Sequence, residues 1–137
     1  MHFHAYAYRG PGEAIQPFDD ARRPGGAGFE TATVPPEFTS AWLARPSRSV
    51  QGTWDEAAGA VEWMKEQYED IADSRMHPEL QAQAPSLAMM AETATDALRG
   101  GDDVVWAWWL RGGNYVELAV ICCPNRHTDA PCPARRG

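Results

Sequence analysis

Two alternating apolar segments near the C-terminus, residues 104–111 and 115–123, constrain the fold most strongly. Gly112-Gly113-Asn114 separates them, and two such segments joined by a short turn form an antiparallel hairpin. A three-residue turn with Asn114 left-handed creates one wholly apolar face: Val104, Trp106, Trp108 and Leu110 opposite Val116, Leu118, Val120 and Cys122. A two-residue turn would instead place Glu117 beside Trp108. The first register separates the two faces more cleanly, so we expect its apolar face to be the core side.

The first nine residues also alternate and predict a strand that joins the same sheet. One side carries His2, His4, Tyr6 and Tyr8, and the other carries Phe3, Ala5 and Ala7. Prolines and glycines then interrupt residues 13–51. We expect only short strands there, at about 29–34 and 47–51, and a helical turn at about 37–44.

The middle of the chain has helical periodicity. Thr53 and Glu56 have the spacing of a capping box, and a core stripe follows to about residue 75. A second stripe covers about residues 78–99 and ends at Gly100-Gly101, while Pro85 kinks or restarts that helix. The short connection between about 54–75 and about 78–99 predicts an antiparallel helical pair.

These elements predict a single α+β domain over residues 1–123. We expect two layers, in which an antiparallel sheet including the hairpin at about 104–123 packs on the helical pair. Residues 124–137 contain prolines and arginines, and we expect a flexible C-terminal tail there.

The formal charge of −7 disfavours nucleic acid as a partner, because such binding depends on many Lys and Arg contacts with phosphate. Apolar runs are too short to span a membrane, and the N-terminus lacks the pattern of a secretory signal. We therefore expect a cytoplasmic protein. Nothing in the sequence calls for a cofactor.

The C-terminus carries the sharpest local pattern, Cys122-x4-His127-x4-Cys132. This spacing resembles the last three ligands of the zinc-knuckle family, whose first ligand would fall at Ala119. His2 or His4 could supply the fourth ligand if the first strand lies beside the last. The alternative is a buried Cys122 that ends a strand, followed by a tail with an incidental His and Cys. The sequence favours this alternative and hence no bound metal.

Two groups of side chains are candidates for binding. Trp63 lies off the core stripe beside the acidic residues Glu62 and Glu66, an arrangement typical of a partner contact unless the long loop covers Trp63. Glu117 lies in a strand among aromatic residues, where burial would raise its carboxyl pKa and suit a catalytic acid. The simpler interpretation is an ion pair with Arg111 across the hairpin. Trp109 and Tyr115 flank this second group.

The sequence therefore leaves two functional classes open. The first is a small acidic, non-catalytic accessory or regulatory protein that binds another macromolecule, with a homo-oligomer also allowed. The second is a small enzyme or small-molecule-binding protein, with a pocket between the outer sheet face and the loop of residues 13–51. The positions of Glu117 and Trp109 distinguish them: a covered site favours a ligand, and an open flat patch favours a protein partner.

Overall fold

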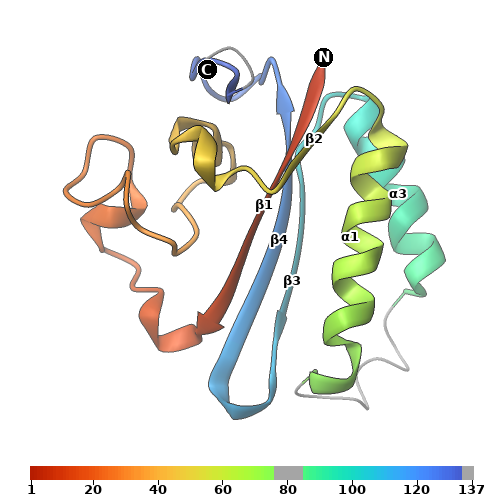
Figure 1. Ribbon diagram of the computed structural model, residues 1–137, viewed down its shortest axis with the longest axis horizontal. Coiled ribbons are helices and arrows are strands. Elements are labelled where there is room, and N and C mark those ends of the chain that lie inside the picture. Colours follow the sequence, from red (N-terminus) through yellow and green to blue (C-terminus); the bar gives the residue numbers. More distant parts are fainter. Residues whose placement is uncertain (76–84, 134–137) are drawn as a thin grey trace.

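A computed structural model describes residues 1–75 and 85–133. Its sheet is antiparallel with the strand order β2-β1-β4-β3, where β1 is His2–Pro11, β2 is Gly52–Trp54, β3 is Val104–Trp109 and β4 is Asn114–Cys123. The helices α1 (Ala57–Ile71) and α3 (Leu87–Arg99) cover one face of the sheet, and residues 12–51 cover part of the other (Figure 1). The expected α+β architecture with helices packed on an antiparallel sheet is confirmed.

The two longest strands, β1 and β4, form the centre of the sheet. Their pairing runs from His2 opposite Cys123 to Pro11 opposite Asn114. Because successive side chains of a strand point to opposite faces, Phe3 and Ala5 join the core under the helices, whereas Tyr6 packs on the other face. The predicted first strand, its place in the sheet and its two faces are confirmed.

The hairpin has the predicted apolar face but a different turn. Trp106 lies opposite Leu118 and Trp108 opposite Val116, on the side of the helices. The turn residues with positive φ are Gly112 and Gly113, at 79° and 78°, whereas Asn114 has φ −78° and begins β4. The left-handed Asn114 was therefore wrong. Glycine has no Cβ and adopts this conformation at lower cost than asparagine.

The main core lies between the helices and the sheet. Met64 of α1 and Leu98 of α3 are fully buried and pack on apolar side chains from three strands, among them Phe3, Trp106, Leu118, Val120 and Cys122. This burial is what gives the helical stripes of the sequence their stability, since isolated helices of this length are marginal in water.

A second, smaller core fills the opposite face of the sheet. The Trp42 ring stacks on Tyr6 at 5.1 Å between centroids, and Leu43 is fully buried beside it. Arg45 is also fully buried. Its guanidinium lies 4.6 Å from the centre of the Phe29 ring and donates to the Ala21 carbonyl at 3.2 Å, and burial lowers its pKa to about 10. These contacts hold residues 12–51, the irregular segment, against the sheet.

Within that segment, the helical turn expected at about 37–44 is confirmed as a 3-10 helix, Thr39–Ala44. The two short strands expected at about 29–34 and 47–51 were wrong. A turn followed by irregular backbone occupies the first range, and a 3-10 helix, Ser47–Ser49, occupies most of the second. The segment is fixed by turns and buried side chains, with Gln51 donating from its backbone to Ala5 at 2.7 Å.

The expected capping box at the start of the first helix was also wrong. Thr53 belongs to β2, and Glu56 is the N-cap residue of α1 without a side-chain cap. The second helix was expected to start at about residue 78, but residues 76–84 lie outside the described ranges. In the described part, Ser86 caps α3 by accepting from the Met89 amide at 3.2 Å, directly after Pro85. No helix of the described residues is long and apolar enough to cross a membrane.

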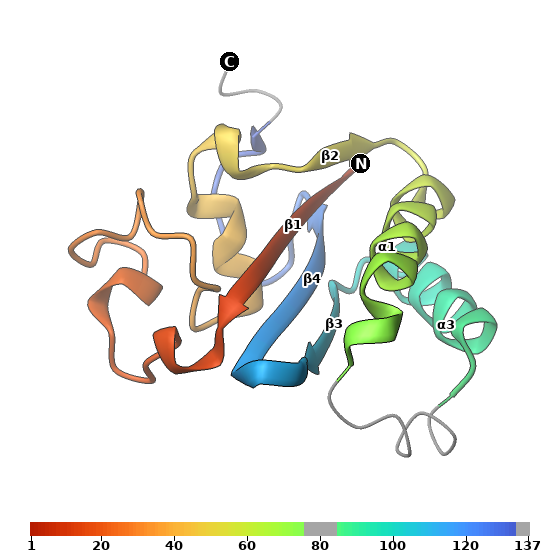
Figure 2. The ribbon, with the colours of Figure 1, turned by 60° about the horizontal axis from the view of Figure 1, so that its bottom comes forward.

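Residues 124–133 fold back over one end of the sheet. The Asn125 side chain donates to both carboxylate oxygens of Asp103, at 2.8 and 3.0 Å, and Arg126 pairs with Asp102 at 3.0 Å. The start of β1, the strand β2 and this C-terminal segment therefore lie at the same end of the molecule (Figure 2). The hairpin turn lies at the other end (Figure 1).

Candidate metal centre

Three side chains with metal-binding atoms meet at that end of the sheet: His2, His4 and Cys132. The Cys132 Sγ lies 3.3 Å from Nδ1 of His2 and 3.2 Å from Nε2 of His4. One ligand atom from each residue lies within 4.8 Å of the others. His2 and His4 share a face because they are two positions apart on β1, and the folded-back segment brings Cys132 to that face.

The second nitrogen of each imidazole has an oxygen next to it. His2 Nε2 lies 3.6 Å from Oδ1 of Asp55, and His4 Nδ1 lies 2.9 Å from Oγ1 of Thr53. In metal sites the ligating histidine usually donates its other N–H to a carboxylate or another oxygen, which orients the ring and fixes the tautomer. Only His4 has such an oxygen at hydrogen-bond distance, since Asp55 lies 3.6 Å from His2 Nε2 and its side chain is largely exposed. Thr53 and Asp55 come from β2 and from the turn that leads into α1.

The spacing of the three ligand atoms suits a tetrahedral ion. Zinc binds sulfur at about 2.3 Å and imidazole nitrogen at about 2.0–2.1 Å, which separates neighbouring S and N ligands by about 3.5 Å. The two measured S to N distances, 3.3 and 3.2 Å, are close to this value.

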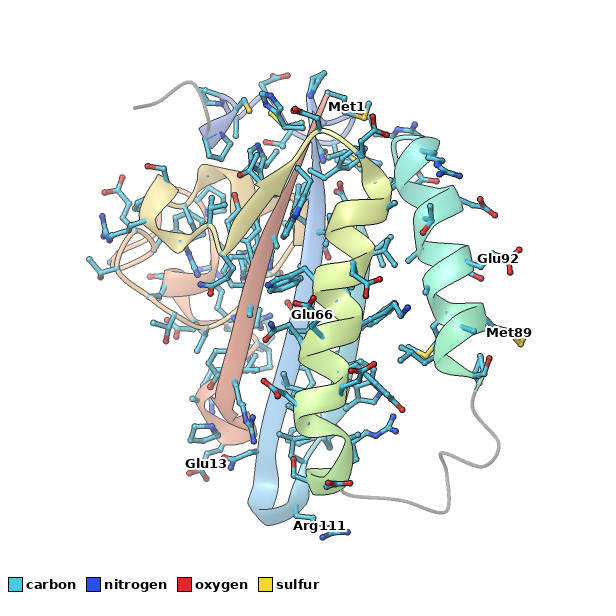
Figure 3. The ribbon with its side chains drawn as sticks, turned by 45° about the vertical axis from the view of Figure 1, so that its right-hand side comes forward. Met1, Glu13, Glu66, Met89, Glu92 and Arg111 are labelled. Carbon is cyan, nitrogen blue, oxygen red and sulfur yellow. The ribbon has the colours of Figure 1, made fainter. Side chains whose placement is uncertain are left out.

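The cluster is partly shielded from water. His4 is fully buried, and His2 and Cys132 are half-buried. A cavity of about 450 Å³ adjoins them and is lined by Met1, Cys123, Asn125 and Asp129 among others. Figure 3 shows Met1 and the side chains of the C-terminal segment gathered at this end, away from Arg111 at the hairpin turn.

The metal ligands considered from the sequence, Cys122, His127 and Cys132, are not brought together. Cys122 lies in the core beneath the helices, where its thiol contacts the Asp102 carbonyl at 3.5 Å. Burial, followed by the nearby carboxylates of Asp103 and Asp102, raises the pKa of the Cys122 thiol to about 12. His127 is exposed. These three residues do not form one site because Cys122 points to the helix side of β4, whereas Cys132 lies against His2 and His4 on the opposite face.

Sequence reasoning found part of the assembled cluster. It considered Cys132 together with Cys122 and His127, and it offered His2 or His4 as one further ligand on the condition that the first strand lies beside the last. The pairing of β1 with β4 meets this condition. The contribution of Asp55 and Thr53 was missed, since Thr53 was assigned to a helix cap. The alternation of His2 and His4 in the first strand was the available signal.

Trp63 was expected to lie on an exposed binding surface, but it is only partly exposed. Trp63 is half-buried, packs against the main core and lies 6.2 Å from the Trp54 ring, measured between centroids. Glu62 and Glu66 are exposed on α1, and Glu62 pairs with Lys65 at 3.5 Å. Figure 3 places Glu66 midway along α1, far from Arg111. The candidate residues on α1 and on the hairpin therefore do not form one continuous surface.

Glu117 lies on the outer face of the sheet opposite Ala107, not beside Arg111, which is exposed in the turn. Tyr115 donates its hydroxyl to Glu117 Oε1 at 3.4 Å. Burial raises the pKa of the Glu117 carboxyl, and the Trp42 indole beside it acts in the opposite direction. Burial, followed by the charge of Glu117, raises the pKa of Tyr115 to about 12.

Trp109 lies at the open end of this group. It is 52% exposed, and its ring lies 5.2 Å from that of Tyr115 between centroids. A cavity of about 890 Å³ is lined elsewhere, by Phe38, Asp103, Val105, His127 and their neighbours, and Glu117 is not among its lining residues. Glu117 therefore lies beside Tyr115 and Trp42 and does not line this cavity.

Comparisons with known proteins identify no relative: no family model, no curated protein and no solved structure matches the chain.

Proposed function

We propose that this protein binds a transition-metal ion through His2, His4 and Cys132, and that the ion fastens the C-terminal segment to the first strand. One observation carries the proposal. The Cys132 sulfur lies at ligand spacing from one nitrogen of each histidine, while the other nitrogens face Asp55 and Thr53. Thr53 is also the strand partner of His4 across β1 and β2, so the meeting of the three donor atoms is what supports the proposal.

The donor set selects the class of metal. Imidazole and thiolate suit zinc and copper, whereas calcium and magnesium require oxygen ligands. Two neutral imidazoles and one thiolate leave a divalent ion with one positive charge. The nearby Asp55 carboxylate offsets part of that charge.

The proposed role is non-catalytic, and it replaces the expectation from the sequence that no metal is bound. A metal held between residues 2 and 132 links the two ends of the described chain and stabilises the folded state by its binding free energy. A cytoplasmic location would keep Cys132 reduced and available as a ligand. Binding of another macromolecule remains a separate hypothesis, and Trp109, which is 52% exposed, is the aromatic candidate that the sequence named for it.

The test is a metal titration of the full chain, with zinc competed against a chromophoric chelator and the bound metal counted by elemental analysis. We expect one zinc per chain. His4→Ala and Cys132→Ala should each weaken binding by at least about 100-fold, because each removes one ligand. His127→Ala, which removes an exposed imidazole from the same segment, is the matched control and should bind like the parent. Absence of stoichiometric binding, or equal loss in the His127 variant, would reject the proposal.

A further inference from the structure

Cys123 lies next to the proposed metal centre but is not one of its three clustered residues. It is the last residue of β4 and pairs directly with His2 of β1. Residues that face each other across an antiparallel pair point to the same side and have Cβ atoms about 4.5–5.5 Å apart. The Cys123 side chain therefore lies on the same face of the sheet as His2 and His4, which we call the histidine face, and it is only 5% exposed.

The neighbouring residue, Cys122, points to the opposite face of the sheet. Cys122 pairs with Phe3 and joins the core beneath the helices, with its sulfur 3.9 Å from the Leu98 carbonyl. Cys123 instead lines the cavity of about 450 Å³ together with His2 and Cys132. Two adjacent thiols thus face opposite sides of the sheet, and only one of them faces the histidines.

Three ligands occupy three corners of a tetrahedron, and the fourth corner must be filled by water or by another side chain. Cys123 lies across from His2 and lines the same cavity as His2 and Cys132, on the face of the sheet from which the other three residues would hold the ion. Resting on the proposed function, we infer that Cys123 is the fourth ligand and that the centre is a closed zinc site with two cysteines and two histidines.

A second thiolate changes the charge and the chemistry of the site. Two thiolates balance the charge of Zn²⁺, so the fully buried His4 and the nearly buried Cys123 enclose a neutral centre. Two sulfur and two nitrogen ligands in a tetrahedron are typical of structural zinc, and they leave no open position for a water nucleophile. The metal is therefore zinc in a structural role.

The first experiment counts sulfur ligands in the unmodified full chain by zinc X-ray absorption. We expect two sulfur neighbours at about 2.3 Å and two nitrogen neighbours at about 2.0–2.1 Å. One sulfur with three lighter neighbours would overturn the role of Cys123 but leave the proposed function intact. Absence of bound zinc would reject both.

The second experiment replaces zinc by Co²⁺, whose thiolate charge-transfer band grows with the number of sulfur ligands. Cys123→Ala should reduce the band to about half and weaken binding by about 10- to 100-fold or more. Cys122→Ala is the matched control, because it removes the adjacent thiol on the other face, and its band should equal that of the parent. A parental spectrum in the Cys123 variant would overturn the inference. Should either variant fail to fold, the sulfur count in the unmodified chain decides.

Discussion

Nε2 of His4 lies 3.2 Å from Sγ of Cys132, although 128 positions separate the two residues along the chain. The contact depends on two independent features of the fold. Pairing of β1 with β4 places His4 at the centre of the sheet, and the bonds of Asn125 and Arg126 to Asp103 and Asp102 direct the following residues back over it. The proposed metal centre depends on this closure of the C-terminal segment over β1.

Zinc should stabilise the protein in a pH-dependent manner. Because the ion binds the folded chain, saturating zinc should raise the Tm, and a chelator should lower it to the value of the Cys132→Ala variant. Imidazole and thiol must lose protons to bind metal, so the affinity should fall as the pH is lowered from about 7.5 to about 5.5. Thermal melts with zinc and with chelator across this range provide the measurement. A Tm independent of both would contradict the prediction.

Asp55→Ala should weaken zinc binding by about 10-fold without removing a ligand, because the Asp55 carboxylate lies 3.6 Å from Nε2 of His2. Glu56→Ala is the matched control: it removes an exposed carboxylate one position away, at the start of α1. Zinc competition titrations of the two variants should differ. Equal affinities would show that the contact between Asp55 and His2 has no role in metal binding.

Asp103→Ala should destabilise the protein by about 1–3 kcal/mol, since its carboxylate accepts from the Cys122 amide at 2.8 Å and from the Asn125 side chain. Asp102→Ala removes an exposed ion pair with Arg126 and should cost less than about 1 kcal/mol. Urea unfolding of both variants measures the difference. The reverse order would mean that the half-buried bonds of Asp103 do not hold the C-terminal segment.

Met64→Ala should cost about 2–5 kcal/mol, because Met64 is fully buried between the helices and the sheet and its truncation leaves a cavity. Glu66→Ala, two positions along the same helix on its exposed side, should change stability by less than about 0.5 kcal/mol. Chemical denaturation gives both values. Similar losses in the two variants would contradict the orientation of α1.

Glu117→Gln should stabilise the protein at neutral pH. Burial raises the folded-state pKa of Glu117 above its unfolded value of about 4.3, so the folded state holds the proton more tightly between these two pKa values. The stability of the parent therefore falls as the pH rises through that window, and the neutral amide removes this loss. The gain in Tm should be present at pH 7 and absent below about pH 4. Glu13→Gln, at an exposed carboxylate, should show no such difference.

The sequence predicted well the elements whose buried and exposed side chains alternate in a regular pattern along the chain. The alternation of Phe3 and Ala5 with His4 and Tyr6 established both the strand and its two faces, and the apolar face containing Trp106 and Leu118 was recognised before its partners were known. Predictions failed where the same short motif is compatible with two different structures. Thr53 has the spacing of a helix cap, yet it lies in β2 and its hydroxyl meets His4.

The sequence by itself determined the α+β class, the faces of the strands and the residue types able to bind metal, because these depend on local spacing and side-chain chemistry. Only the tertiary structure decided which of those residues meet. The one-residue offset between Cys122 and Cys123 sends one thiol into the core and the other to the histidine face, and the direction of the chain after β4 brings Cys132 to His2 and His4. Contacts between the two ends of a chain depend on strand order and chain reversal, which local periodicity does not encode.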